Sequence, residues 1–284
     1  MSPDRLAERF GPHVLREYAL LADGERGALI GPLGDVAWLC FPSWGDDALL
    51  SSLIGGGGAY AVTPSARCVW GGYYERGSLI WRSRWITDEG IVECREALAM
   101  PGRRGRAVLL RRVIAVSGDA RVRVLLELRG AFGRRPAWDL ARDDEGAWRG
   151  RTGDHHFCWA GAAGASVGGA GDGQALSLDL EVEAGSHHDL VLALDARREP
   201  QAPEPQGAWT GTEAAWAERV PRFEQTMAPR DARHAYAVLA GLTSSGGGMV
   251  AAATTSLPER GRAGNSYDYR YVWIHEQDSA CLFS

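Results

Sequence analysis

The feature that most constrains the fold is a change in hydrophobic periodicity near residue 200. Up to about Asp195 apolar and polar residues alternate, as in 176–183, where leucine or valine alternates with serine, aspartate or glutamate. Residues 122–128 follow a similar pattern. Alternation with a period of two residues is typical of a β-strand with one solvated face. Beyond the proline-rich stretch 199–208 the pattern is helical, so the sequence predicts a β-rich part followed by helices.

Short apolar runs between glycine-rich breaks predict further strands in the first part of the chain. The breaks lie at 55–58, 71–72 and 168–173. Many closely spaced strands with glycine turns, and no helical periods between them, indicate a mainly β fold, an antiparallel β-sandwich over residues 1–198. The additional strands expected are 26–31, 35–41, 59–63, 67–74, 79–85, 90–98, 107–116 and 187–195.

The stretch 199–208 reads EPQAPEPQGA, and proline is disfavoured inside helices and sheets. We therefore expect helix to begin only beyond this connector. An amphipathic helix is expected over 211–220, with Trp216 facing inward and Pro221 ending or kinking it. A second helix is expected over 231–242.

This second predicted helix is apolar almost all the way round its middle, where it reads AYAVLA. Such a helix is normally buried inside a larger assembly. Residues 243–284 are too few to enclose it, so we expect it to rest on the sandwich, pair with a second copy or aggregate. Self-association is favoured, because a wet patch containing Tyr236, Leu239 and Leu242 costs about 25 cal/mol per Å².

Charge and composition exclude several classes of function. The chain carries 31 basic and 36 acidic side chains, a net charge of −5, whereas a nucleic-acid-binding domain would show a basic stripe. Every basic residue is arginine, so mechanisms that need lysine, such as a phosphate-loop nucleotide site or a Schiff base, are excluded. The sequence shows no signal-peptide core and no run of about 18 apolar residues. We expect a cytoplasmic protein with no nucleic-acid or membrane partner.

The cysteines and histidines predict no metal site, and no cofactor is expected. The five cysteines are widely spread without a CxxC pair and are expected to be buried thiols. The histidine pairs at 155–156 and 187–188 lie on predicted strands, where adjacent side chains point to opposite faces. The run 168–173 lacks the spacing of a nucleotide loop, and Ser279 stands where a zinc-protease motif beginning at His275 needs its second histidine.

The aromatic run YDYRYVWIHEQD at 267–278 is the strongest candidate for a binding site. Flat apolar rings, fixed carboxylates and cations are the groups that bind sugars. The alternative is an aromatic strand that only packs in the core. The small, hydroxyl-rich stretch 249–259 precedes this run and could approach a ligand closely.

Two long segments resemble a known family. The run REYALLADGERGALIGPLGDVAWLCFPSW at 16–44 and the run GLTSSGGGMVAAATTSLPERGRAGNSYDYRYVWI at 241–274 are similar to segments of glycoside hydrolase family 15, the glucoamylases and trehalases. The resemblance implies an N-terminal β-sandwich (a supersandwich), a linker helix and then the first helices of an (α/α)6 barrel. It also implies inverting hydrolysis of α-glucosidic bonds by two glutamates in later barrel helices, before which this chain ends.

The resemblance carries particular residues with it. Tyr269 and Trp273 fall on family positions beside the bound glucose. The family stretch then ends in arginine and aspartate, which bind sugar hydroxyls, whereas this chain has His275 and Glu276. A neutral histidine offers one donor against the multi-donor fork of arginine, and losing a charged hydrogen bond costs about 1.5–3 kcal/mol. The expected substrate-binding residues are therefore Tyr269, Trp273, His275 and Glu276, with no catalytic residue in this chain.

Three interpretations remain open. The chain is the N-terminal part of such a hydrolase, with domains 1–198, 199–228 and 229–284, truncated in the gene or in expression. Alternatively it is a non-catalytic carbohydrate-binding module or pseudoenzyme, or a sandwich that serves only as an assembly surface. The expected ligand is an α-glucoside such as trehalose or a malto-oligosaccharide. In the first interpretation the chain alone is expected not to hydrolyse these sugars, because it lacks both glutamates.

Overall fold

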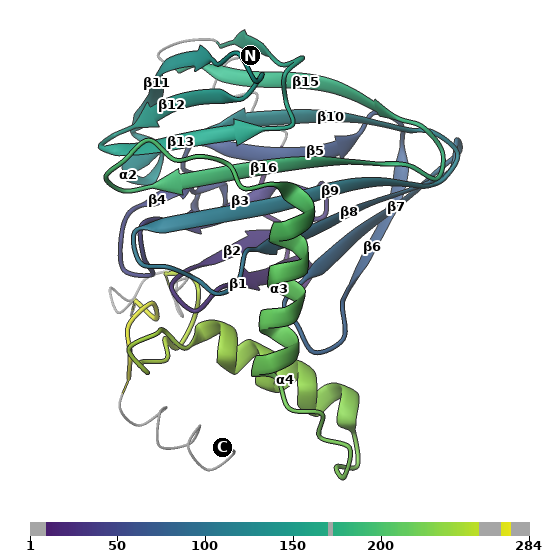
Figure 1. Ribbon diagram of the computed structural model, residues 1–284, viewed down its shortest axis with the longest axis vertical. Helices are drawn as coiled ribbons and strands as arrows, with labels where there is room; N and C mark the ends of the chain where they lie inside the picture. The colour runs from purple at the N-terminus through teal and green to yellow at the C-terminus, as the bar shows by residue number, and fades with distance from the viewer. Residues whose placement is uncertain (1–9, 170–172, 256–267, 274–284) are drawn as a thin grey trace.

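The computed structural model describes residues 10–169, 173–255 and 268–273, and its strands form three antiparallel sheets (Figure 1). Sheet A holds β1 (Ala19–Ala22), β2 (Gly27–Ile30), β3 (Val36–Cys40) and β4 (Ala48–Leu50). Sheet B has the order β14 (Ser166–Gly168), β15 (Ala175–Val182), β10 (Ala120–Glu127) and β5 (Ala59–Pro64). Sheet C has the order β11 (Arg135–Arg142), β12 (Trp148–Thr152), β13 (His155–Ala160), β16 (His187–Asp195), β9 (Arg106–Ser117), β8 (Ile91–Leu98), β7 (Trp81–Thr87) and β6 (Cys68–Tyr74).

The main core lies between sheet C on one side and sheets A and B on the other. The alternating residues predicted to face inward do so: Val122, Val124 and Leu126 of β10 are each at most 1% exposed. Trp85 of β7 and Trp159 of β13 reach the same core from sheet C. The mainly β, antiparallel fold predicted from the alternation is confirmed.

The sequence did not predict β1, β4, β11, β12 and β14, and of β13 it indicated only the strand histidines 155–156. Sheet A strands are short, and β3 is buried at every position, so they show no alternation. Strands β11 and β12 carry several arginines on solvated positions and form one edge of sheet C, where polar residues are common. Their hydrophobic signal is therefore weak.

The first long helix, α3 (Pro205–Arg219), begins earlier than the sequence predicted. The expectation that helix starts only beyond the connector 199–208 is wrong, because Pro205 stands at the first position of the helix. A proline there loses no hydrogen bond, and its fixed φ suits the helix. The Glu204 carboxylate caps the start by accepting hydrogen bonds from the amides of Gln206 at 2.8 Å and Gly207 at 2.6 Å. The helix ends at Arg219, just before Pro221, as predicted.

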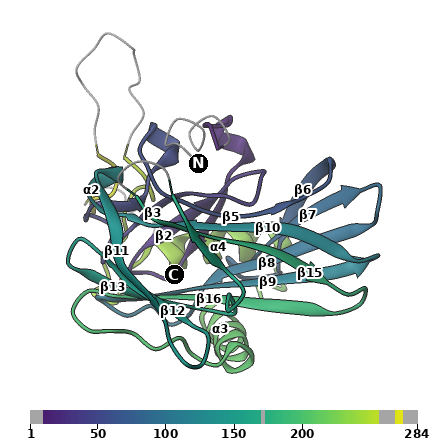
Figure 2. The same cartoon turned by 90° about the horizontal axis from the view of Figure 1, so that it is seen from above.

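Helix α3 crosses the outer face of sheet C at β9 and β16, on the side away from β3 and β5 (Figure 2). Trp209 and Trp216 of this helix are buried, so the inward placement predicted for Trp216 is confirmed. The indole Nε1 of Trp209 donates to the Asp189 carboxylate at 3.1 Å, and the Arg95 guanidinium lies 4.3 Å from the Trp209 ring centre. A second apolar core therefore joins the helices to the sandwich.

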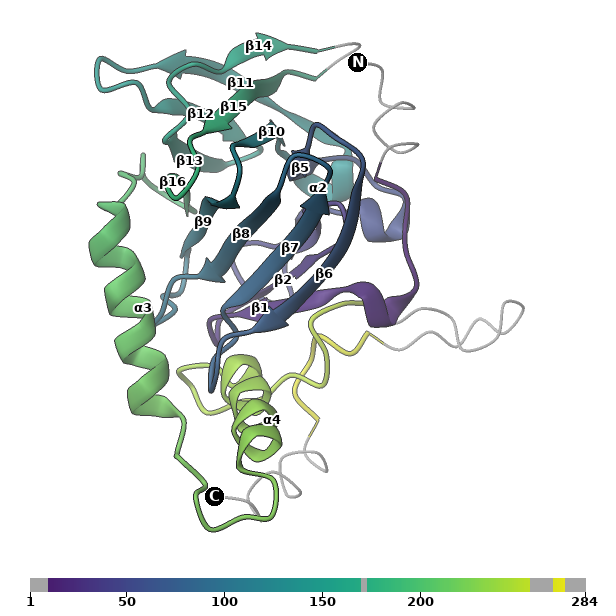
Figure 3. The same cartoon turned by 90° about the vertical axis from the view of Figure 1, so that its right-hand side faces the viewer.

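Helix α4 (Pro229–Leu242) begins two residues before the predicted Asp231 and packs beneath β1 (Figure 3). Leu242 is buried, whereas Tyr236 and Leu239 are half-buried. The helix thus rests on the sandwich, one of the three arrangements expected from its apolar surface. Self-association stays a prediction. None of the helices in the described ranges is long and apolar enough to cross a membrane.

Docking of α4 is expected to weaken as the pH falls below about 6.5. The centre of the His234 ring lies 4.6 Å from the centre of the Tyr74 ring. Partial burial lowers the pKa of His234, the charge of Arg230 lowers it further, and the charge of Asp231 opposes this only in part. The detached helix therefore binds a proton at higher pH than the docked one, so acidification favours detachment. Hydrogen exchange of the α4 amides at about pH 7.5 and pH 5.5 measures this, after correction for intrinsic rates.

The variant H234Q should remove most of this pH dependence, because glutamine does not titrate. H187Q is the matched control, since His187 is half exposed on β16. An unchanged pH dependence in H234Q would contradict the assignment.

Candidate functional site

The candidate site is built from two chain segments that lie side by side, 249–255 and 268–273. The amide of Ala251 donates to the carbonyl of Tyr271 at 3.2 Å, and the amide of Ala252 donates to the carbonyl of Tyr269 at 2.9 Å. These bonds place the small-residue loop singled out in the sequence directly against the aromatic run. Ala251 and Ala252 on this loop are half-buried, and Ala253 is buried.

Tyr269 and Trp273 lie together in this segment. Their ring centres are 6.4 Å apart and the ring planes are inclined by 39°. Both side chains are half-buried, whereas Tyr271 is 58% exposed. The arrangement keeps two aromatic faces partly accessible. Of the other predicted site residues, His275 and Glu276 lie outside the described residues.

Arg270 contacts the sandwich and is 7% exposed. Its Nη1 donates to the carbonyls of Asp46 at 2.8 Å and Trp44 at 3.3 Å, and to the Sγ of Cys40 at 3.4 Å. Its Nε and Nη2 donate to the carboxylate of Asp268, the shorter bond being 2.7 Å. The aromatic segment is thereby attached to β3 and to the loop that follows it.

Asp268 and Arg270 form a partly buried ion pair. Partial burial alone raises the pKa of Asp268, but hydrogen bonds and charge from Arg270 outweigh it, and the pKa falls below its ordinary value. The hydrogen bonds to Asp268 also hold the pKa of Arg270 above its ordinary value. Both groups are therefore charged at neutral pH.

Trp38 and Phe132 complete the support of the site. The indole Nε1 of Trp38 donates to the carbonyl of Ala253 at 2.9 Å, which fixes the small-residue loop. Phe132 lies in the short turn α2 (Gly130–Gly133), with its ring 6.2 Å from the Trp38 ring and 5.9 Å from the Arg270 guanidinium carbon. Ala131 and Phe132 both have positive φ, 53° and 56°, which non-glycine residues rarely adopt.

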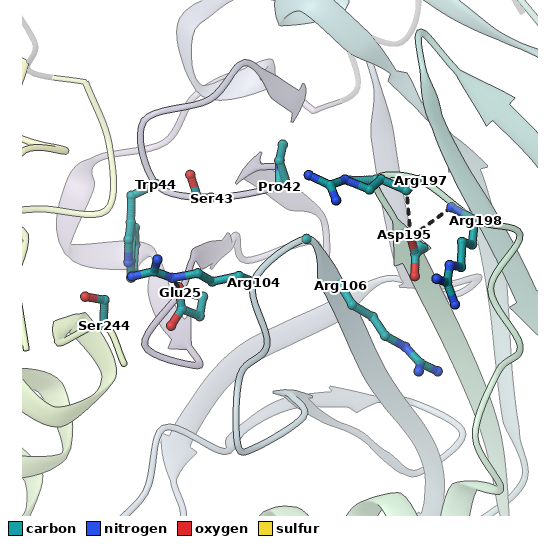
Figure 4. Close-up of a pocket in the computed structure, with 12 residues that line it drawn as sticks. Glu25, Pro42, Ser43, Trp44, Arg104, Arg106, Asp195, Arg197, Arg198 and Ser244 are labelled. Atoms are coloured by element: carbon teal, nitrogen blue, oxygen red, sulfur yellow. Dashed lines mark hydrogen bonds and ion pairs between the residues drawn. The ribbon is translucent and has the colours of Figure 1, made fainter. Parts of the chain in front are cut away.

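A cleft of about 770 Å³ is lined in part by Pro42, Ser43 and Trp44, which belong to the loop after β3 (Figure 4). Trp44, Glu25 and Ser244 line one end of it, and the indole of Trp44 is fixed by a 2.9 Å hydrogen bond to the carbonyl of Gly24. The arginines at the cleft are Arg104, Arg106, Arg197 and Arg198. Their guanidinium groups point in different directions and do not converge on one point (Figure 4). The arrangement is therefore not that of a preformed anion site.

A second cleft, of about 490 Å³, lies beside the same loop. It is lined by His155 and by the acidic residues Asp46, Asp47 and Asp154, among others. The His155 ring contacts Phe41 edge to face at 5.0 Å, and partial burial lowers its pKa. Within the described part of the chain no group of three histidine, cysteine, aspartate or glutamate side chains is placed to hold a metal ion.

The aromatic run in the sequence predicted the aromatic pair but indicated no role for Arg270. The available signal was the spacing of Asp268 and Arg270, two residues apart in an aromatic run. The partners of Arg270 on the loop after β3 lie more than 220 positions away in sequence. No local pattern could have identified them.

The sequence model of the family described as "Trehalase-like, N-terminal" matches residues 10–198. Trehalases of Mycobacterium tuberculosis and Mycolicibacterium smegmatis are 29% and 28% identical to this chain over 94% of its length. The matches cover 43% and 44% of those relatives, so the chain spans less than half their length.

A bacterial glucoamylase crystallised with acarbose has a similar fold, with a TM-score of 0.59 at 9% identity. The match covers 92% of this chain and 47% of that one. The resemblance to the glucoamylase and trehalase family drawn from residues 16–44 and 241–274 is thus confirmed. The chain belongs to this family, and residues 10–198 match its trehalase-like N-terminal domain.

Proposed function

We propose that this chain is the N-terminal part of a trehalase- or glucoamylase-type glycosidase. In this proposal Tyr269 and Trp273 form part of an α-glucoside-binding site. The observation that carries the proposal is the pair of partly accessible rings, whose centres lie 6.4 Å apart. The C–H faces of a glucose ring pack on such aromatic faces. Family membership and the names of the mycobacterial relatives support an α-glucoside, trehalose or a malto-oligosaccharide, as the ligand.

In this proposal the chain divides into a sandwich (1–198), a connector with the linker helix (199–228) and the start of an (α/α)6 barrel (229–284). His275 and Glu276 would contact sugar hydroxyls beside Trp273. Hydrolysis with inversion would need a glutamic acid to protonate the glycosidic oxygen and a glutamate to activate water on the opposite face. Both would come from the parts of the longer relatives that this chain does not cover. No cofactor takes part in this scheme.

The test is a titration of the 284-residue chain with trehalose and with maltose, followed by tryptophan fluorescence and calorimetry. Replacing Trp273 with alanine should weaken binding by about tenfold or more, since a buried aromatic contact at a binding site is commonly worth at least about 1.4 kcal/mol. W138A is the matched control, because Trp138 is 47% exposed on β11, far from residue 273 in the sequence.

Equal affinity of W273A and the parent chain would remove the aromatic pair from the site. Absence of binding to either sugar would favour the alternative in which the sandwich is an assembly surface. Binding without glucose release would be expected both of an N-terminal part and of a non-catalytic module. Joining the chain to the part of a relative that it does not cover would then separate these two alternatives, because only an N-terminal part of a hydrolase should give glucose release in such a fusion.

A further inference from the structure

The side chain of Arg270 joins the candidate sugar site to the sandwich. Two backbone hydrogen bonds tie segment 268–273 to the loop 249–255, which is itself an extended connection. Arg270 adds three hydrogen bonds to Cys40, Trp44 and Asp46, all on β3 or on the loop after it. These bonds reach a part of the chain whose backbone is already fixed by sheet A.

We propose that Arg270 is a positioning residue: it latches the Tyr269–Trp273 pair onto the sandwich, which thereby becomes part of the sugar site. The sugar-binding half of this inference rests on the proposed function. The latch itself rests on the contacts of Arg270. Arg270 is buried between Tyr269, which is half-buried, and Tyr271, which is exposed, so one buried side chain sets the position of the rings beside it.

The chemistry of the latch requires arginine. The planar guanidinium offers five N–H groups in a fixed fork, so one edge can bind the Asp268 carboxylate while Nη1 reaches the loop carbonyls. Its charge is balanced by Asp268 and otherwise faces neutral acceptors. A lysine is a point charge without this fork and could satisfy only part of the set.

The turn under the latch supports the same conclusion. Ala131 and Phe132 adopt left-handed backbone conformations that disfavour side chains, and the result is a phenyl ring against both Trp38 and the Arg270 guanidinium. Trp38 in turn holds Ala253. Two sandwich side chains and one strained turn therefore converge on the segments 249–255 and 268–273.

The first experiment measures amide hydrogen exchange in the 284-residue chain and in the variants R270Q and R270K. In R270Q the amides of Ala251 and Ala252 should exchange about tenfold faster or more, because their carbonyl partners are no longer held in place. R270K should lie between R270Q and the parent. Amides of β9 and β16 should be unchanged, and circular dichroism should show an intact sandwich.

R123Q is the matched control, because Arg123 makes an exposed ion pair with Asp179 on sheet B. If R270Q proves too unstable to study, D268N removes the carboxylate side of the latch and leaves the loop contacts of Arg270 in place. D268N should then speed exchange at Ala251 and Ala252 by a smaller factor. Exchange at these amides that matches R123Q in both variants would overturn the latch.

The second experiment repeats the trehalose and maltose titrations with R270Q. We expect about a tenfold or greater loss of affinity with an unfolding midpoint equal to that of R123Q, a combination that general destabilisation would not produce. Unchanged affinity together with faster exchange would overturn the positioning role. If the parent chain itself binds neither sugar, the proposed function fails at that step, and the exchange result alone decides the latch.

Discussion

Replacing Arg111 with methionine is expected to lower the free energy of unfolding by about 3–5 kcal/mol. Arg111 on β9 and Glu96 on β8 lie opposite each other in the sheet register and are both fully buried. Removing only the arginine leaves the carboxylate of Glu96 in the core without its counter-charge. Such an uncompensated charge costs far more than the lost packing.

The surroundings of the pair explain why it is tolerated in the parent chain. The Nη2 atom of Arg111 donates to the Glu96 carboxylate and also to the carbonyl of Gly34 at 2.5 Å. Its Nη1 atom donates to the carbonyl of Tyr60 at 3.1 Å. The other carboxylate oxygen of Glu96 accepts from the Ser83 hydroxyl at 2.7 Å. Burial alone lowers the pKa of Arg111, but the charge of Glu96, its hydrogen bond to Arg111 and the other polar groups around the guanidinium together outweigh this, and the arginine stays protonated.

Urea unfolding followed by tryptophan fluorescence measures the effect. R123M, at an exposed ion pair, is the control and should change the free energy of unfolding by less than about 1 kcal/mol. The double variant E96Q/R111M should recover much of the loss, because it removes both charges. A single variant R111M that is as stable as R123M would show that the core tolerates the lone carboxylate.

The arginine–glutamate pair also marks how far the sequence could predict the fold. Alternation along 122–128 and 176–183 is a local pattern set by the pleat of a strand, so it predicted the strands and their buried faces. The pairing of Glu96 with Arg111 depends on the register between two strands, which the pattern within one strand does not contain. The start of α3 was misplaced for a different reason: Pro205 breaks a helix interior but fits its first position.

The candidate site was likewise predicted only in part. Tyr269 and Trp273 were found because the aromatic run is contiguous and resembles a family segment. The support beneath them was not found, since Trp38, Phe132 and Arg270 come from three distant parts of the chain. Their meeting depends on left-handed backbone conformations at Ala131 and Phe132, neither of which is glycine, so tertiary packing sets them and the sequence carries no signature.

Replacing Trp216 with alanine is expected to lower the free energy needed to detach α3 from the sandwich by about 3–5 kcal/mol. Trp216 is 2% exposed and belongs to the second core with Val220 and Ala240. Its ring also lies 3.5 Å from the point where a side chain at Gly241 would begin, so the indole fills the space between α3 and α4. Loss of the indole therefore leaves a cavity shared by both helices.

Amide hydrogen exchange shows which parts of the chain lose stability in W216A. Amides of both α3 and α4 should lose protection in W216A, because the indole contacts both helices, while amides of β9 and β16 should change much less. W138A is the control, since Trp138 is about half exposed on β11 and its removal leaves no enclosed cavity. Loss of protection confined to α3 would contradict a shared core. Equal loss throughout sheet C would mean that the helices and the sandwich unfold as one unit, and the boundary proposed near residue 198 would then have no counterpart in stability.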